Sequence, residues 1–183
     1  MSACGFALFD TAIGPCAIAW NDRGIAGVQL PGSSPDATRT QMRKRFADFR
    51  ETEPSEAARD AIDRIIALMA GNPGDMSPIP LDMEGVRDFN RRVYDVTLAI
   101  PPGQTLTYGE VAERIGEPGA AQSVGQALGA NPVPIIVPCH RVLAAGGKIG
   151  GFSAPGSIAT KRKMLAIEAD AAGPALPLFA ASS

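Results

Sequence analysis

The residues best suited to covalent chemistry lie side by side near position 140. Cys139 is one of three cysteines, and His140 is the only histidine among 183 residues. Cysteine attacks carbon as a thiolate, and a neighbouring imidazole or cation is the usual means of lowering its pKa from about 8.5 toward neutrality. Any covalent chemistry of this chain is therefore expected at Cys139.

The chain around this pair limits how the two side chains could cooperate. An apolar, strand-like run over residues 133–137 leads to Pro138, immediately before Cys139. Neighbours on a regular strand point to opposite faces, so a direct hydrogen bond between them is not expected. Either Pro138 bends the chain, or His140 acts through a water molecule. The alternative without function is a buried cysteine that happens to precede a surface histidine.

Composition argues against a metal site and against a membrane protein. Structural zinc usually takes four Cys or His ligands, and this chain could supply them only by using Cys139 and His140, so no metal is predicted. Cys4 and Cys16 are expected to be small buried hydrophobic residues. No apolar run is long enough to cross a bilayer and no signal-peptide pattern is present, so we expect a cytoplasmic protein without a membrane partner.

Charge is distributed unevenly along the chain. Residues 1–85 carry 8 basic and 12 acidic side chains, whereas residues 86–169 carry 9 basic and 6 acidic ones. The second part, with a net charge of +3, is the part that could bind phosphates.

The first 80 residues predict a small α/β domain. Hairpin-like breaks separate three expected strands, and Ser caps begin two expected helices. The strands are Gly5–Thr11, Pro15–Asn21 and Gly24–Pro31, the helices are 34–50 and 55–70, and a Gly/Pro-rich linker covers 71–80.

The remainder is expected to be mostly helical. A stripe of apolar residues predicts a helix over 86–100, and a capping box at Thr107–Glu110 starts another that ends at Ile115. A Gly-containing turn and a helix over 120–130 complete a helix-turn-helix layout, whose second helix has an unusually small-residue surface. After a hairpin turn at 145–148 and a loop at 150–156, a last helix is expected over 157–169, and the tail 171–183 is expected to be flexible.

Residues 86–169 closely resemble the C-terminal domain of the O6-alkylguanine-DNA alkyltransferases. The matching stretches follow the family's order at nearly its spacing, and residues 1–85 match its variable N-terminal domain more loosely. The stretches are 100–103, 107–112, 123–128, 131–142 (with Pro-Cys-His-Arg at 138–141) and 161–168.

The resemblance implies an α+β protein with two domains. Residues 1–80 would form a ribonuclease H-like α/β domain, and residues 86–170 a winged-helix-like domain that binds DNA and accepts the alkyl group. The implied activity is single, irreversible transfer of a methyl or other alkyl group from O6-alkylguanine to Cys139, with O4-alkylthymine as a further candidate substrate. The implied partner is double-stranded DNA carrying the lesion, with no cofactor, and we expect a monomer.

The resemblance also implies roles for individual residues. His140, through a water, would accept the thiol proton of Cys139, while Glu168 orients the imidazole. Tyr108 would donate a hydrogen bond to the flipped base, and Asn131 would brace the turn at the site. The remaining implied substrate and DNA contacts are Ala121, Gln122, Ser123, Arg141, Val142, Phe152 and Ser153.

Two positions depart from the family pattern. Gln122 stands where an arginine usually fills the space left by the flipped base, which predicts slower repair or weaker duplex binding. The loop with Phe152, where tyrosine is frequent, is about two residues longer than the common form.

Three other functions are considered. An alkyltransferase-like protein would bind the lesion without transfer, but such proteins lack the nucleophile that Cys139 provides. A cysteine hydrolase would need better dyad geometry than adjacent Cys and His offer. A thiol redox sensor would need a resolving cysteine, and Cys4 and Cys16 are expected in the other domain.

Overall fold

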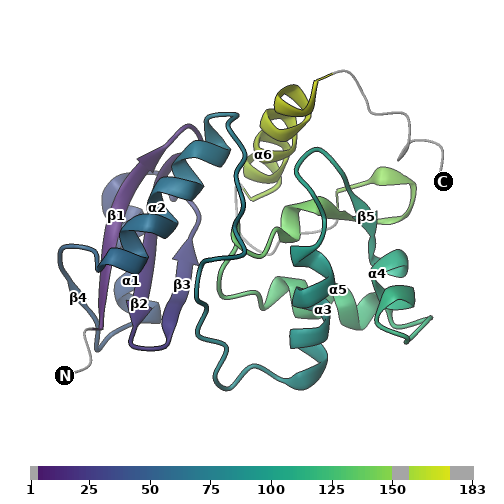
Figure 1. The fold of residues 1–183 in the computed structure, drawn as a ribbon, viewed down its shortest axis with the longest axis horizontal. Coiled ribbons are helices and arrows are strands. Elements are labelled where there is room, and N and C mark those ends of the chain that lie inside the picture. The colour runs from purple at the N-terminus through teal and green to yellow at the C-terminus, as the bar shows by residue number, and fades with distance from the viewer. Residues whose placement is uncertain (1–3, 150–156, 174–183) are drawn as a thin grey trace. The chain divides into compact units, whose positions relative to one another are not determined.

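The computed structural model describes residues 4–149 and 157–173, and these form two compact units (Figure 1). The N-terminal unit comprises residues 4–84 together with Pro132–Ile136. The C-terminal unit comprises residues 85–131, 137–149 and 157–173. Phe152, Ser153 and the tail beyond Gly173 lie outside the described residues.

The N-terminal unit is built on a four-stranded sheet in the order β3-β2-β1-β4. Strands β1 (Gly5–Thr11), β2 (Gly14–Asn21) and β3 (Gly24–Gln29) form consecutive antiparallel hairpins, close to the predicted bounds. A short β4 (Arg50–Glu51) pairs in parallel with the start of β1.

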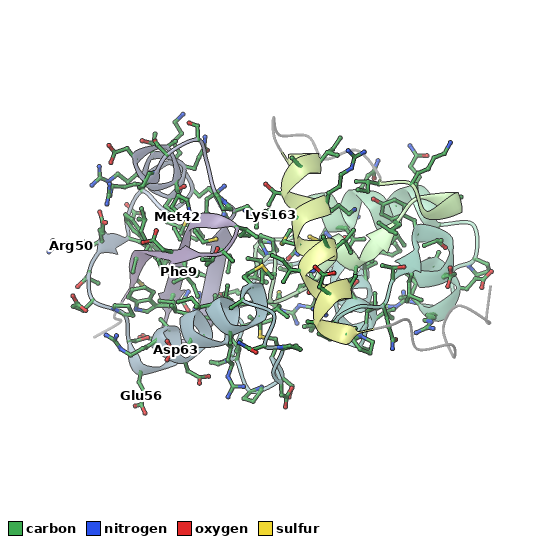
Figure 2. All side chains as sticks on the ribbon, turned by 90° about the horizontal axis from the view of Figure 1, so that it is seen from above. Phe9, Met42, Arg50, Glu56, Asp63 and Lys163 are labelled. Atoms are coloured by element: carbon green, nitrogen blue, oxygen red, sulfur yellow. The ribbon has the colours of Figure 1, made fainter. Side chains whose placement is uncertain are left out.

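Two helices cover the two faces of this sheet, as Figure 2 shows with Met42 of one and Asp63 of the other. Helix α1 (Pro35–Arg45) packs Met42 against Phe6 and Ala17, and α2 (Glu56–Met69) buries an apolar stripe on the opposite face. Both begin at the predicted serine caps, Ser34 and Ser55.

Helix α1 ends five residues earlier than predicted. The backbone leaves the helix at Phe46, and the rings of Phe46 and Phe49, whose centroids are 5.0 Å apart, pack on the core cluster. Burying two aromatic rings outweighs the few tenths of a kcal/mol that helix propensity gives each residue.

The outer edge of β3 does not remain open. Ile25 N–H donates to Pro80 O at 2.8 Å and Asp82 N–H to Ile25 O at 2.9 Å, so the end of the predicted linker pairs with the strand. Further along the same edge, Val28 N–H donates to Pro132 O at 2.9 Å. The edge is therefore covered by two segments distant in sequence.

The C-terminal unit is mainly helical. Helix α3 (Asp88–Leu98) contacts both α4 (Tyr108–Arg114) and α5 (Ala121–Gly129). The Tyr94 hydroxyl of α3 donates to Ala127 O of α5 at 2.7 Å in the interior. The predicted capping box is present: Glu110 N–H donates to Thr107 Oγ1, and Thr107 N–H donates to Glu110 Oε1.

Helices α4 and α5 are joined by a tight turn, as the sequence predicts. Gly116 and Gly119 adopt φ of 80° and 90°, a left-handed conformation that costs other residues about 1–2 kcal/mol. These two glycines therefore set the direction in which α5 leaves the turn.

The apolar run before Cys139 is not the predicted strand. It forms a turn in which Ile135 has φ of 75°, and Cys139–Arg141 is a single 3-10 turn, η1. Prolines at 132, 134 and 138 lack an N–H donor, so this segment cannot supply a continuous ladder. The bend after Pro138 places Cys139 and His140 on a helical turn rather than on opposite faces of a strand.

The elements after Arg141 also differ from expectation. Strand β6 (Val142–Leu143) pairs in parallel with β5 (Leu106–Thr107). At the predicted turn, Ala145–Gly147 forms a 3-10 turn, η2, in which Ala144 N–H donates to Lys148 O at 2.7 Å and Gly147 N–H donates to Ala144 O at 3.1 Å. Helix α6 (Ser157–Ala172) runs three residues beyond the predicted end, so Ala171 and Ala172 are helical. Across the described ranges, no helix is long and apolar enough to cross a membrane.

Candidate active site

Cys139 begins the η1 turn and keeps 7% of its surface exposed. Burial raises the pKa of its thiol. A hydrogen bond with the Asn131 side chain, the charge of Lys161 and the backbone N–H groups of Cys139 and His140 oppose that rise. Because burial dominates, the resting side chain is a neutral thiol, and the reaction requires a base.

His140 is fully buried and bound to a carboxylate. Its Nε2 lies 3.0 Å from Glu168 Oε2, and the side chains of both residues are at most 1% exposed. Burial lowers the pKa of His140, and it outweighs the hydrogen bond to Glu168, which acts in the opposite direction. His140 is therefore neutral near pH 7.

The tautomer of His140 follows from its partner. Burial would raise the pKa of Glu168, but hydrogen bonds from Arg141 and His140 hold it at about 2, so the carboxylate is ionised and can only accept. Nε2 therefore carries the proton. Nδ1, which has no hydrogen-bond partner among the described residues, is left with a free lone pair. That lone pair can accept a proton.

Arg141 completes this buried network. Its Nε donates to Glu168 Oε1 at 2.9 Å, its Nη2 to Glu168 Oε2 at 2.6 Å, and its Nη1 to Ile100 O at 2.7 Å. With 5% of its surface exposed, the guanidinium is engaged inside the unit. We therefore assign it to holding Glu168 rather than to the DNA contact expected from the sequence.

Lys161 is a member of the site that sequence reasoning missed. It is 1% exposed, its Nζ donates to Val142 O at 2.9 Å, and it interacts electrostatically with Cys139. Helical spacing could have revealed it, because Lys161 precedes Glu168 by seven residues on α6 and so shares its buried face. The next two residues, Arg162 and Lys163, are basic and exposed, so the three residues together look like an ordinary solvent-facing basic run in the sequence.

Two tyrosines interact electrostatically with Cys139. Burial raises the pKa of Tyr108, and Cys139 adds to the rise, so its hydroxyl keeps its proton. The Tyr108 ring also lies close to α5, since a Cβ built on Gly125 would be 3.9 Å from it. Burial likewise raises the pKa of Tyr94 to about 12, a neighbour that the sequence did not suggest.

Asn131 joins the two ends of the turn before the cysteine. Its Nδ2 donates to Val137 O at 2.9 Å, and its side chain also hydrogen-bonds Cys139. The predicted bracing residue thus contacts both the turn and the nucleophile.

The predicted DNA-contacting residues of α5 lie at its beginning. Gln122 and Ser123 are exposed and Ala121 is half-buried, whereas Val124, Ala127 and Leu128 face the interior. Val142 is buried, and its carbonyl oxygen receives the Lys161 ammonium. Within residues 4–149 and 157–173, no three His, Cys, Asp or Glu side chains cluster as metal ligands would.

Comparison with known proteins assigns the chain to a family. Residues 88–170 match the model of a protein family described as "6-O-methylguanine DNA methyltransferase, DNA binding domain". A methylated-DNA–protein-cysteine methyltransferase of Mycobacterium tuberculosis is 38% identical over 170 residues, which cover 93% of this chain and 95% of the relative. The chain belongs to the methylated-DNA–protein-cysteine methyltransferase family.

Other members of this methyltransferase family extend the similarity. One from Methanothermobacter thermautotrophicus is 33% identical over 151 residues, or 82% of this chain and 77% of the relative. The crystal structure of the M. tuberculosis O6-methylguanine methyltransferase has a TM-score of 0.74 and 35% identity, covering 98% of this chain and 99% of that one. A structure of the M. tuberculosis protein in complex with DNA has a TM-score of 0.72 and 34% identity, covering 91% and 94%.

Proposed function

We propose that this protein repairs DNA by transferring a methyl or other small alkyl group from O6 of guanine to Sγ of Cys139. The observation that carries the proposal is the arrangement around this thiol. His140, the residue after Cys139, is neutral, its Nε2 is held by Glu168, and its Nδ1 lone pair has no partner among the described residues, in a chain of this family. The donor is the lesion and the acceptor is the protein, so no cofactor takes part.

The reaction begins with removal of the thiol proton. A water molecule relays this proton to His140 Nδ1, and the imidazolium that forms is stabilised by Glu168. The sulfur lone pair then forms a bond to the alkyl carbon while the bond from that carbon to guanine O6 breaks. The bonding electrons pass to the purine. The Tyr108 hydroxyl, which keeps its proton, donates a hydrogen bond to the departing purine.

The product is a thioether, which thiol–disulfide exchange does not reverse. Each chain therefore acts once. Lysine, asparagine and backbone N–H groups around Cys139 stabilise the thiolate during the attack, and this favours the transition state over the resting thiol.

The Cys139 thiol is buried in the protein and cannot reach O6 of a paired guanine, so transfer requires the target nucleotide to leave the duplex. We assign α4 and α5 to DNA binding, with the exposed Gln122 and Ser123 and the half-buried Ala121 at the groove. The small side chains of α5 suit close approach to a minor groove. A relative solved with DNA supports this partner. Main-chain groups near Val142 are proposed to receive the flipped base, and the expected contacts Phe152 and Ser153 lie outside the described residues.

Finer assignments belong to the same proposal. The N-terminal domain, residues 1–80, is assigned to the ribonuclease H-like class, and residues 86–170 to a winged-helix-like class. The protein is proposed to act as a cytoplasmic monomer on O6-alkylguanine, with O4-alkylthymine as a further substrate to be tested.

Intact-mass measurement tests this function. The protein is incubated with a duplex that carries one O6-methylguanine, and the same duplex with guanine serves as control. The expected result is a permanent gain of one methyl group per chain, located on Cys139 by peptide mapping and absent in Cys139→Ala. A protein that binds the methylated duplex without gaining mass would be a lesion binder, and the proposal would be wrong.

A further inference from the structure

The five residues that lead to the active-site turn belong to the N-terminal unit. Within Pro132–Ile136, Val133, Ile135 and Ile136 are at most 2% exposed. Ile135 has φ of 75°, a conformation that is strained for a β-branched residue and persists only where surrounding contacts impose it. Contacts within the N-terminal unit therefore hold this turn, although Cys139 lies three residues beyond it.

Arg45, the last residue of α1, makes a side-chain hydrogen bond to this segment. Its Nη2 donates to Pro132 O at 3.0 Å, and its Nη1 donates to Val28 O at 2.8 Å and to Gln29 Oε1 at 3.0 Å. Pro132 O also accepts the Val28 N–H at 2.9 Å. The planar guanidinium thus bridges the two carbonyl groups at this point of the sheet edge.

The surroundings of Arg45 restrict its orientation. Its guanidinium lies 5.1 Å from the centre of the Phe46 ring. A Cβ on Gly27 would come within 2.4 Å of that ring and 2.9 Å of Arg45 Nη2, so the bare strand lets both side chains approach. Arg45 is exposed to solvent, but stacking on Phe46 and three acceptors together favour one geometry of its guanidinium.

Pro132 is bonded covalently to Asn131, which contacts the nucleophile. The Asn131 side chain donates a hydrogen bond to Val137 O, just beyond the other end of the segment, and also hydrogen-bonds Cys139. We propose that Arg45 is a positioning residue for the alkyl transfer, acting through Pro132 on Asn131 and so on the Cys139 thiol. This inference rests on the proposed function, and it gives the N-terminal unit a part in the chemistry.

Three variants of the full-length protein test the role. Arg45→Met removes the bridge, and Arg45→Lys keeps the charge but cannot reproduce the planar fork. Arg43→Met is the control, because Arg43 lies on the same helix with 65% of its side chain exposed and pairs with Glu51. Single-turnover methyl transfer is measured from pH 6 to 9 on one methylated duplex, alongside thermal unfolding.

We expect Arg45→Met to slow transfer roughly 3- to 10-fold at neutral pH, because one hydrogen bond to the thiolate is weakened. The pH profile should also shift upward, since that bond lowers the pKa of Cys139. Arg45→Lys should lie between this variant and the parent, and Arg43→Met should match the parent. If Arg45→Met does not fold, the transfer rate and pH profile of Arg45→Lys provide the test. A loss of thermal stability without a slower rate or a shifted profile would overturn the inference.

A double-mutant cycle identifies the path. If Arg45 acts through Asn131, Arg45→Met should change neither rate nor pH profile further in an Asn131→Ala background. Additive effects would contradict that path and overturn the inference. Failure of the parent protein to take up a methyl group would instead refute the proposed function, so the two failures are distinguishable.

Discussion

Cys139 is surrounded by groups that act on its proton in opposite directions. Burial holds the proton on sulfur, while Lys161, Asn131 and two backbone N–H groups favour its loss. The balance suits a protein that reacts once, because a neutral thiol is protected from stray electrophiles until a substrate is present. The sequence pointed to Cys139 and His140 by their types alone. It could not show how strongly each neighbour acts, because that depends on burial.

Lys161→Met should make the thiol less acidic. Removing a nearby cation raises the thiol pKa, so transfer near pH 7 should slow by up to about tenfold and the pH profile should move upward. Lys163→Met, which alters an exposed residue of the same helix (labelled in Figure 2), is the matched control. Single-turnover rates across pH measure the effect. Superimposable profiles for Lys161→Met and the parent would exclude an electrostatic role.

Glu168 and His140 should make the protein sensitive to acid. The folded pKa of Glu168, about 2, lies below its ordinary value of 4.5, so its stabilisation is complete above pH 4.5 and is lost as pH falls toward 2. His140 is held neutral in the fold, so the unfolded chain alone gains its proton as pH falls below 6.5, which also favours unfolding.

Glu168→Gln isolates the carboxylate. It leaves Arg141 without its buried anion and should cost about 3–5 kcal/mol at pH 7. The variant should also lose less of its remaining stability than the parent between pH 4.5 and pH 2. Urea unfolding at several pH values measures both effects. Equal acid sensitivity in the two proteins would show that Glu168 is not the titrating group.

At the scale of elements, local signals predicted most helices but failed near the site. The serine caps and the Thr107 capping box correctly mark the starts of α1, α2 and α4, because a cap is a contact between neighbours in sequence. The run over residues 133–137 was expected to be strand-like, but it forms a turn. Its shape is imposed by packing and by a hydrogen bond to β3, about one hundred residues earlier in the chain, and no local pattern encodes such a partner.

The turn between α4 and α5 gives a test at this scale. Gly119→Ala should destabilise the fold by about 1–2 kcal/mol, because φ of 90° is costly for a residue with a Cβ even in open space. Gly129→Ala, at the end of α5 and equally open, should instead stabilise by up to about 1 kcal/mol. Chemical denaturation compares the two. Equal effects would show that the turn tolerates a side chain.

At the scale of the whole molecule, the family and its chemistry could be inferred from the sequence because the relevant residues are contiguous in short motifs. The contributions of Tyr94 and Arg45 could not, since Tyr94 interacts electrostatically with Cys139, and Arg45 contacts Pro132, from distant elements. Charge is a further property of the whole chain. With a net charge of −2, DNA affinity must rest on the modest excess of basic residues after position 85.

Gln122→Arg tests whether the small number of basic residues after position 85 limits DNA binding. A new cation at the exposed start of α5 should tighten duplex binding, speed single-turnover transfer and steepen the dependence of affinity on salt by about one unit of log–log slope. Fluorescence anisotropy between 50 and 200 mM salt, with rates on one methylated duplex, provides the comparison. Equal rates and slopes would show that the side chain at position 122 limits neither duplex binding nor transfer.

The assignment of Pro132–Ile136 to the N-terminal unit limits how the protein can be dissected. The backbone passes between the two units after residues 84, 131 and 136, so one cut in the linker would not yield two complete pieces. A fragment starting at Gly85 would carry Val133, Ile135 and Ile136 into water without their packing partners, and the other fragment would lack part of its own interior. Shortened versions meant to keep only the reactive half should therefore aggregate unless these three side chains are made polar.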